Sequence, residues 1–170
     1  ATQIAIDKRL IVMDCGKTNF DPKDMSEEEY NEKIKNEGIE PFPIRMINPE
    51  IISGFEYIHE NLENVKILDA RSTGEYDGSI IRAAQSGHIP NSINIDWNQN
   101  ISKDGTFKND DELSQMYDYP KDSEIITYCQ GAYRATNTFL VLKKLGFSNV
   151  RVYLGSWGEW GNRLELPVDK

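Results

Sequence analysis

The amino-acid sequence predicts an α/β fold in which helices cover both faces of a parallel sheet. Short apolar stretches rich in β-branched residues, at 65–71, 124–128 and 150–154, are typical of buried strands. Segments with helical spacing or helix-capping signals lie between them, and this alternation is typical of parallel sheets. A chain of 170 residues with 38% hydrophobic residues is also sufficient for one ordinary hydrophobic core.

The first 43 residues differ in character from the rest. Residues 3–13 alternate weakly and predict one or two strands, and the charged segment from Ser26 to Gly38 predicts a helix. Two prolines follow within "EPFPIR", which is typical of an extended connector. We therefore expect an N-terminal extension, or the remnant of a preceding domain or linker, over 1–43 and the main domain over 44–170.

A helix is expected at the start of the main domain. Asn48 followed by Pro49 combines an N-cap residue with a proline in the first turn, which is a common helix-start signal. The apolar face of this helix would be formed by Ile51, Ile52, Phe55 and Ile58.

Strands and helices then alternate. Ser72 and Glu75 have the spacing of a capping box, which predicts a short helix directly after the strand at 65–71. The segment 87–96 predicts a turn followed by a strand, and residues 110–117 predict another short helix.

Composition excludes several classes of partner. The formal net charge of −9 and the pI near 4.8 argue against a nucleic-acid backbone or an anionic membrane surface, because both would repel the chain. No apolar stretch approaches the ~20 residues of a membrane helix, and no signal-peptide pattern opens the chain. These features favour a soluble, cytoplasmic protein. Cys15 and Cys129 are too few for a disulfide framework and lack zinc-ligand spacing, so we expect no metal.

Cys129 lies where an apolar run ends and helical spacing begins. The run from Ile125 to Tyr128 predicts a buried strand, and a helix is expected from Arg134 towards Gly146. Ligand sites of open parallel sheets lie at the carboxyl ends of the strands, where such loops meet. Cys129 therefore opens a strand-to-helix loop at the edge of the sheet where a ligand is expected.

The chemistry of this loop favours a nucleophilic cysteine. A loop that curls over Cys129 would direct backbone N–H groups inward beside a positive helix end, which favours an anion and the thiolate. Arg134 would add a fixed positive charge, and hydrogen-bond donors at the rim are expected from Gln130, Tyr133 and Thr136. The alternative is that Cys129 is an inert buried residue at a strand end. The loop and Arg134 favour catalysis, whereas Cys15 has no such setting.

Residues 44–168 resemble a rhodanese-type sulfurtransferase domain. The matching segments, in the family's order, are "ILDARSTGEYDG", "GHIPNSINIDW", "IITYCQGAYRAT", "LKKLGFSNVRVYLGSW" and "GEWG". The final "GSWGEWGN" is similar to the catalytic half of tandem thiosulfate sulfurtransferases. The resemblance implies a five-stranded parallel sheet with helices on both faces and a persulfide carried by Cys129. It also implies that no metal or organic cofactor is needed.

The length of the loop favours sulfur transfer over phosphoryl chemistry. Cys129 and Arg134 are separated by four residues, whereas the related Cdc25-type phosphatases and arsenate reductases place five residues between the cysteine and the arginine. The longer loop suits a tetrahedral oxyanion, and the shorter one suits a single transferred sulfur atom. The charge of Arg134 favours dianionic thiosulfate as the donor over mercaptopyruvate.

The resemblance also implies the residues of the site. Cys129 is the expected catalytic residue. The residues expected to bind the substrate are Gln130, Gly131, Ala132, Tyr133, Arg134, Arg71 and Ser156. For Arg71, an ion pair with a loop carboxylate such as Glu75 is an equally weighted alternative. For Ser156, which matches a serine that faces the persulfide, a capping or turn role is the alternative.

The expected function is transfer of the outer sulfur of thiosulfate to a nucleophilic acceptor, which is cyanide in an assay and a thiol in the cell. One alternative is a non-catalytic rhodanese-like module that binds a partner or carries sulfur, and the other is an enzyme of the phosphatase or arsenate-reductase type. Because tandem relatives contain two halves, a second rhodanese-like half or a homo-oligomer is a further expected partner.

Overall fold

The structure is a computed structural model, and it describes residues 4–7, 10–13, 32 and 49–170. The chain divides into two compact units, Ala1–Ile47 and Asn48–Lys170. The boundary predicted near Pro43 falls outside the described residues and stays a prediction.

The first unit contains an antiparallel pair of strands. β1 (Ile4–Asp7) pairs with β2 (Leu10–Met13), with Ile4 opposite Met13. The segment 3–13 thus contains two strands rather than one. Cys15 and the helix predicted over 26–38 lie outside the described residues, except for Glu32, which is helical.

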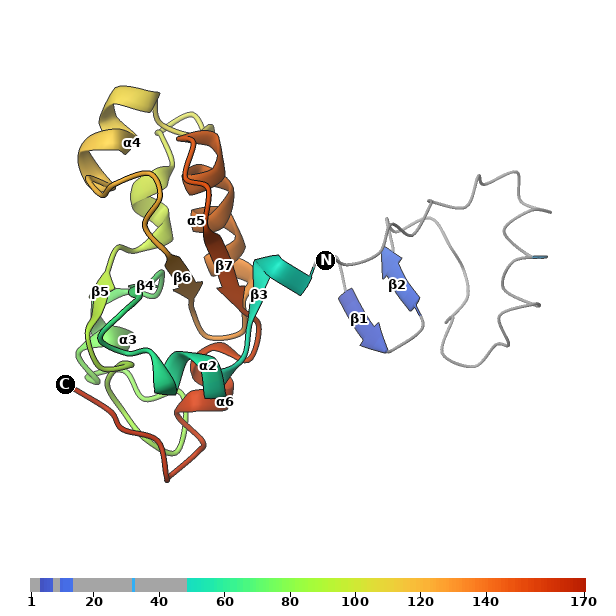
Figure 1. The fold of residues 1–170 in the computed structure, drawn as a ribbon, viewed down its shortest axis with the longest axis vertical. Helices are drawn as coiled ribbons and strands as arrows, with labels where there is room; N and C mark the ends of the chain where they lie inside the picture. Colours follow the sequence, from blue (N-terminus) through green and yellow to red (C-terminus); the bar gives the residue numbers. More distant parts are fainter. Residues whose placement is uncertain (1–3, 8–9, 14–31, 33–48) are drawn as a thin grey trace. The chain divides into compact units, whose positions relative to one another are not determined.

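The second unit is built on a five-stranded parallel sheet (Figure 1). Every neighbouring pair in it is parallel, which confirms the predicted α/β fold. In spatial order the strands are β3 (Ile52–Ser53), β7 (Val150–Tyr153), β6 (Ile125–Tyr128), β4 (Lys66–Asp69) and β5 (Ser92–Asn94).

Short helices connect these strands. None of the described helices is long and apolar enough to cross a membrane. The α-helices are α2 (Phe55–Glu60), α3 (Thr73–Tyr76), α4 (Asp110–Met116), α5 (Tyr133–Lys144) and α6 (Ser156–Trp160). Residues 49–170 also contain two 3₁₀ turns, η2 (Pro49–Ile51) and η3 (Trp97–Asn100).

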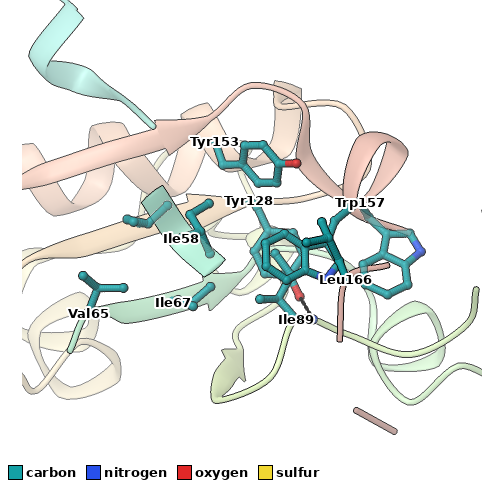
Figure 2. Packing of buried hydrophobic residues seen from close by; sticks show 10 residues of the cluster. Ile58, Val65, Ile67, Ile89, Tyr128, Tyr153, Trp157 and Leu166 are labelled. Carbon is teal, nitrogen blue, oxygen red and sulfur yellow. Dashed lines mark hydrogen bonds between the residues drawn. The ribbon is translucent and has the colours of Figure 1, made fainter. Parts of the chain in front are cut away.

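The hydrophobic core has a layer on each face of the sheet, because side chains alternate between the faces along each strand. On one face, Ile67 of β4 belongs to the same buried cluster as Ile58 of α2 and Trp157 of α6 (Figure 2). On the other face, the adjacent Leu68 packs with Leu113 of α4 and with α5. Helices therefore cover both faces, as the sequence predicts.

The helix predicted to start at Asn48 and Pro49 is wrong in its first part. Pro49 begins a 3₁₀ turn, and Ile52–Ser53 then forms the edge strand β3, which pairs with Val152 and Tyr153 of β7. Gly54 follows in an extended conformation, and α2 begins only at Phe55. Pairing with β7 gives the backbone of Ile52–Ser53 hydrogen-bond partners that an isolated helical turn would not supply.

A short contact joins the turn at Gly87 to the C-terminal segment. His88 and Asp169 exchange two backbone hydrogen bonds of 2.9 and 3.0 Å. Gly87 has a φ of +118°, and a Cβ atom there would lie 2.0 Å from the carbonyl oxygen of Asp169. Only glycine combines this backbone conformation with such close packing.

Replacing Gly87 with alanine should therefore lower the free energy of unfolding by more than the backbone strain of a positive φ accounts for. The added Cβ displaces Asp169 and breaks both hydrogen bonds to His88, an extra loss of roughly 1–3 kcal/mol. Gly105→Ala is the matched control, because Gly105 also has a positive φ but a Cβ atom added there would meet no atom within 4 Å. Chemical denaturation of both variants measures the difference, and equal losses would contradict this account.

Candidate active site

Cys129 lies directly after the last residue of β6, at the carboxyl end of a central strand. Only 1% of its surface is exposed. It packs against Ala70, Ala135 and Val152, on the face of the sheet that α5 covers. Residues that follow or belong to different strands therefore meet around the thiol, as expected at the carboxyl ends of parallel strands, where ligands bind.

The loop after Cys129 reaches α5 through a left-handed residue. Ala132 has a φ of +67°, a conformation that costs a residue with a Cβ roughly 1–2 kcal/mol. Its carbonyl accepts a hydrogen bond from Thr136 N, and Tyr133 N donates to Gly131 O. Within the described part of the chain, the amides of Gln130 and Gly131 donate to no acceptor. They are thus available to bind an anion.

Ser156 holds the loop through its side chain. Its buried Oγ accepts hydrogen bonds from Cys129 N at 3.3 Å and from Ala132 N at 3.1 Å, and it donates to Tyr153 O at 2.8 Å. Ser156 also has a positive φ, of 52°. Two loop amides are therefore occupied by a side chain of the protein, and Ser156 connects β7 to the cysteine loop.

Arg134 makes a two-point ion pair with Glu75. Its Nη1 and Nη2 atoms lie 2.7 and 2.9 Å from the two carboxylate oxygens. These hydrogen bonds raise the pKa of Arg134, and the nearby Cys129 sulfur raises it further. The same hydrogen bonds, with a smaller contribution from Ser72, lower the pKa of Glu75 to about 2 although burial opposes this shift. Arg134 is therefore a permanent cation beside Cys129.

Glu75 is the residue of the candidate site whose pairing with Arg134 the sequence does not predict. The predicted capping box with Ser72 is present, since Ser72 N and Oγ both donate to Glu75 Oε2, at 3.2 and 2.9 Å. The carboxylate is 4% exposed and also lies 3.5 Å from Arg82 Nε. The capping-box spacing is a signal for the position of Glu75, but it does not indicate its cationic partners.

Arg71 is buried rather than open to a ligand. Its guanidinium binds the Asp69 carboxylate, with a shortest contact of 2.6 Å, and donates to Gly87 O at 2.8 Å. It also lies over the ring of Trp157, 4.5 Å from the centroid. Burial lowers the pKa of Arg71, but the hydrogen bonds to Asp69 keep it above its ordinary value. The sequence suggests Glu75 as an ion-pair partner of Arg71, but in the structure the partner is Asp69.

The remaining predicted residues line the rim of the loop. Gln130 donates from Nε2 to Arg82 O at 3.2 Å and accepts at its backbone carbonyl from Gly158 N at 2.9 Å. Tyr133 is 65% exposed. A Cβ atom added at Gly131 would meet no atom within 4 Å, so open space lies beside this residue. Their roles as substrate ligands stay predictions.

The ion pair between Glu75 and Arg134 predicts a specific pH dependence of stability. Ionised Glu75 stabilises the folded chain above the ordinary glutamate pKa of 4.5, and this contribution is lost as the pH falls towards 2. The difference in unfolding free energy between the wild type and Glu75→Gln should be constant above about pH 5 and should shrink below it. Denaturant titrations at several pH values measure this difference. The exposed Glu63→Gln is the control, and a Glu75→Gln difference that does not change with pH would contradict the prediction.

Among the described residues, no group of three or more histidine, cysteine, aspartate or glutamate side chains is arranged to hold a metal ion. The groups that the described site offers to a ligand are a thiol, a guanidinium and free backbone amides.

Known proteins resemble this chain in sequence. It is 33% identical over 134 residues to a thiosulfate sulfurtransferase of Pseudomonas aeruginosa, with 76% of this chain and 49% of that protein covered. It is 37% identical to a thiosulfate sulfurtransferase of Azotobacter vinelandii, and this match covers 62% of this chain and 40% of that protein. It is 39% identical to the sulfur carrier protein TtuD of Thermus thermophilus, and this match covers 61% of this chain and 41% of that protein. The chain thus spans less than half the length of each of these relatives.

Solved structures share the fold. The wild-type structure of EanB matches 77% of this chain and 33% of its own with a TM-score of 0.66 at 24% identity. The crystal structure of YnjE matches 72% of this chain and 33% of its own, with a TM-score of 0.65 at 23% identity. The sequence profile described as "Rhodanese-like domain" matches residues 55–163, which include the sheet from β4 to β7 and the whole cysteine loop. The chain therefore belongs to the rhodanese-like domain family, and it is homologous to thiosulfate sulfurtransferases.

Proposed function

We propose that this chain is the catalytic part of a thiosulfate sulfurtransferase that carries the transferred sulfur on Cys129. The observation that carries the proposal is the position of Cys129 at the start of a loop that ends with Arg134 and presents the unpaired amides of Gln130 and Gly131. A persulfide anion on Cys129 would be stabilised by these donors and by the positive charge of Arg134.

The proposed reaction has two displacement steps. The Cys129 thiolate attacks the outer sulfur of thiosulfate, a new S–S bond forms, and sulfite leaves with the electrons of the broken S–S bond. An acceptor nucleophile then attacks the outer sulfur of the persulfide and restores the thiolate. With cyanide as the acceptor the product is thiocyanate, and with a thiol it is a persulfide of that thiol. Neither step needs an external oxidant or reductant.

The burial of Cys129 supports its use as a persulfide carrier. Only 1% of the residue is exposed, and a bulky reagent would reach the sulfur poorly. A persulfide in such a position is shielded from unwanted thiols while it waits for its acceptor. We assign Ser156, Glu75 and Arg71 to positioning of the loop and its surroundings, because each is held by other groups of the protein.

A sulfur carrier that receives its sulfur from another protein is the second candidate function. The resemblance to the Thermus thermophilus sulfur carrier protein supports it. The pairing of Arg134 with Glu75 supports it as well, because a neutralised arginine attracts a free dianion less strongly. The two candidates differ in the donor and share the Cys129 persulfide.

Intact-mass measurement after incubation with thiosulfate tests the proposal. The wild type should gain the mass of one sulfur atom, and cyanide should remove it as thiocyanate is released. Cys129→Ser should gain nothing, because its hydroxyl cannot form a persulfide. Cys15→Ser is the matched control and should load as the wild type does, which would map the sulfur to Cys129.

The outcome also separates the two candidate functions. Folded protein that stays unloaded with thiosulfate, but accepts sulfur at Cys129 from a low-molecular-weight persulfide, would favour the carrier. Sulfur that is still gained by Cys129→Ser would overturn both. Circular dichroism of each variant shows whether its fold is intact.

A further inference from the structure

We propose that Arg82 supplies the positive charge that recognises the anionic sulfur donor, an inference that rests on the proposed function. Arg82 lies in the segment between α3 and β5, outside the motifs that sequence reasoning assigns to the substrate.

The two arginines expected to bind the donor are both neutralised inside the protein. Arg134 is held at two points by Glu75, whose two oxygens lie 2.7 and 2.9 Å from its nitrogens. Arg71 is buried and held by Asp69 through its Nε and Nη2 atoms. Each pair has no net charge, so neither provides an excess of positive charge for a dianion such as thiosulfate.

Arg82 adds the charge that these pairs lack. Its Nε atom lies 3.5 Å from Glu75 Oε1, the same oxygen that accepts from Arg134 Nη2 at 2.9 Å. One carboxylate therefore faces two guanidinium groups, and two positive charges with one negative charge leave a net charge of +1. Because the pKa of Glu75 is about 2, its carboxylate stays ionised at neutral pH, and these three side chains together keep a charge of +1 there.

The backbone of Arg82 lies beside the cysteine loop. Its carbonyl oxygen accepts a hydrogen bond of 3.2 Å from the side chain of Gln130, the residue that follows Cys129. Arg134, the other arginine on Glu75, lies at the end of the same loop. The surplus charge therefore lies beside the loop that Cys129 begins.

The side chain of Arg82 is also available to a ligand. It is 58% exposed, whereas the side chain of Arg134 is 26% exposed. Its single contact of 3.5 Å with Glu75 is long for an ion pair, and Glu75 keeps its two hydrogen bonds to Arg134 when Arg82 leaves, so an incoming anion can replace this contact at little cost. Arg82 can therefore turn from Glu75 to a sulfonate oxygen of the donor while Arg134 stays in place.

Binding of thiosulfate without chemistry tests this proposal. In the Cys129→Ser background, where no sulfur transfer can occur, calorimetry gives the affinity for thiosulfate with and without Arg82→Ala. We expect Arg82→Ala to weaken binding roughly three- to tenfold, and Arg82→Lys to retain most of the affinity. Lys66→Ala is the matched control, because Lys66 is an exposed cation at the opposite, amino end of β4.

Ionic strength and kinetics provide a second readout. Added salt should weaken thiosulfate binding more in the protein that keeps Arg82 than in the Arg82→Ala variant, because salt screens the charge that the variant lacks. In the protein with Cys129 intact, Arg82→Ala should raise the thiosulfate concentration needed for half-maximal loading. The rate at which cyanide removes sulfur from the persulfide should change little, because sulfite has already left the site before that step.

The outcomes separate this proposal from the proposed function. Thiosulfate binding that depends on Arg82 but gives no persulfide on Cys129 would support the anion site and contradict thiosulfate sulfur transfer. An Arg82→Ala protein that binds as tightly as Lys66→Ala would overturn the role of Arg82, as would the absence of any thiosulfate binding to Cys129→Ser. Thermal unfolding of Arg82→Ala checks that the loss of affinity is not a loss of fold.

Discussion

The buried guanidinium of Arg71 is the constraint on which the surroundings of Cys129 depend. An arginine charge removed from water costs several kcal/mol unless partners replace its hydration. Asp69, Gly87 O and the ring of Trp157 provide those partners, with Tyr128 at a greater distance of 5.5 Å. These residues belong to the end of β4, the turn before β5, the start of α6 and the end of β6. The cost of leaving the charge unpaired therefore fixes these four segments to one another, at the carboxyl end of the sheet where Cys129 also lies.

The cysteine loop is held at several points that come from different parts of the chain. Ser156 binds its first and fourth residues, Glu75 binds Arg134 at its end, and Gly158 N donates to Gln130 O. These contacts supply the stabilisation that maintains the left-handed conformation of Ala132. A loop held in this way has its free amides in place before any anion arrives, and little reorganisation is needed when negative charge develops.

Local patterns in the sequence predict the longer strands and the cysteine loop, because a strand buried on both faces leaves an uninterrupted apolar run. They do not predict β3, whose two residues fit the spacing of a helix and become a strand only through pairing with distant β7. The partners of Glu75 are missed for a similar reason. The capping box places Glu75 at a helix start, but Arg134 lies 59 residues away and is brought close only by the fold. Buried pairing of Arg71 with Asp69 likewise follows from packing and not from spacing.

The empty space beside Gly131 has a consequence for how such a site changes during evolution. No atom lies within 4 Å of a Cβ added there, and the backbone of Gly131 does not require glycine. Ser156 and Glu75, which maintain the loop, act on its other residues. A charged, polar or bulky side chain can thus be introduced on the cysteine loop without disturbing the contacts that hold it. The identity of the side chain and the integrity of the loop are therefore separable traits at this position, so the surface of the loop is free to change while its framework is kept.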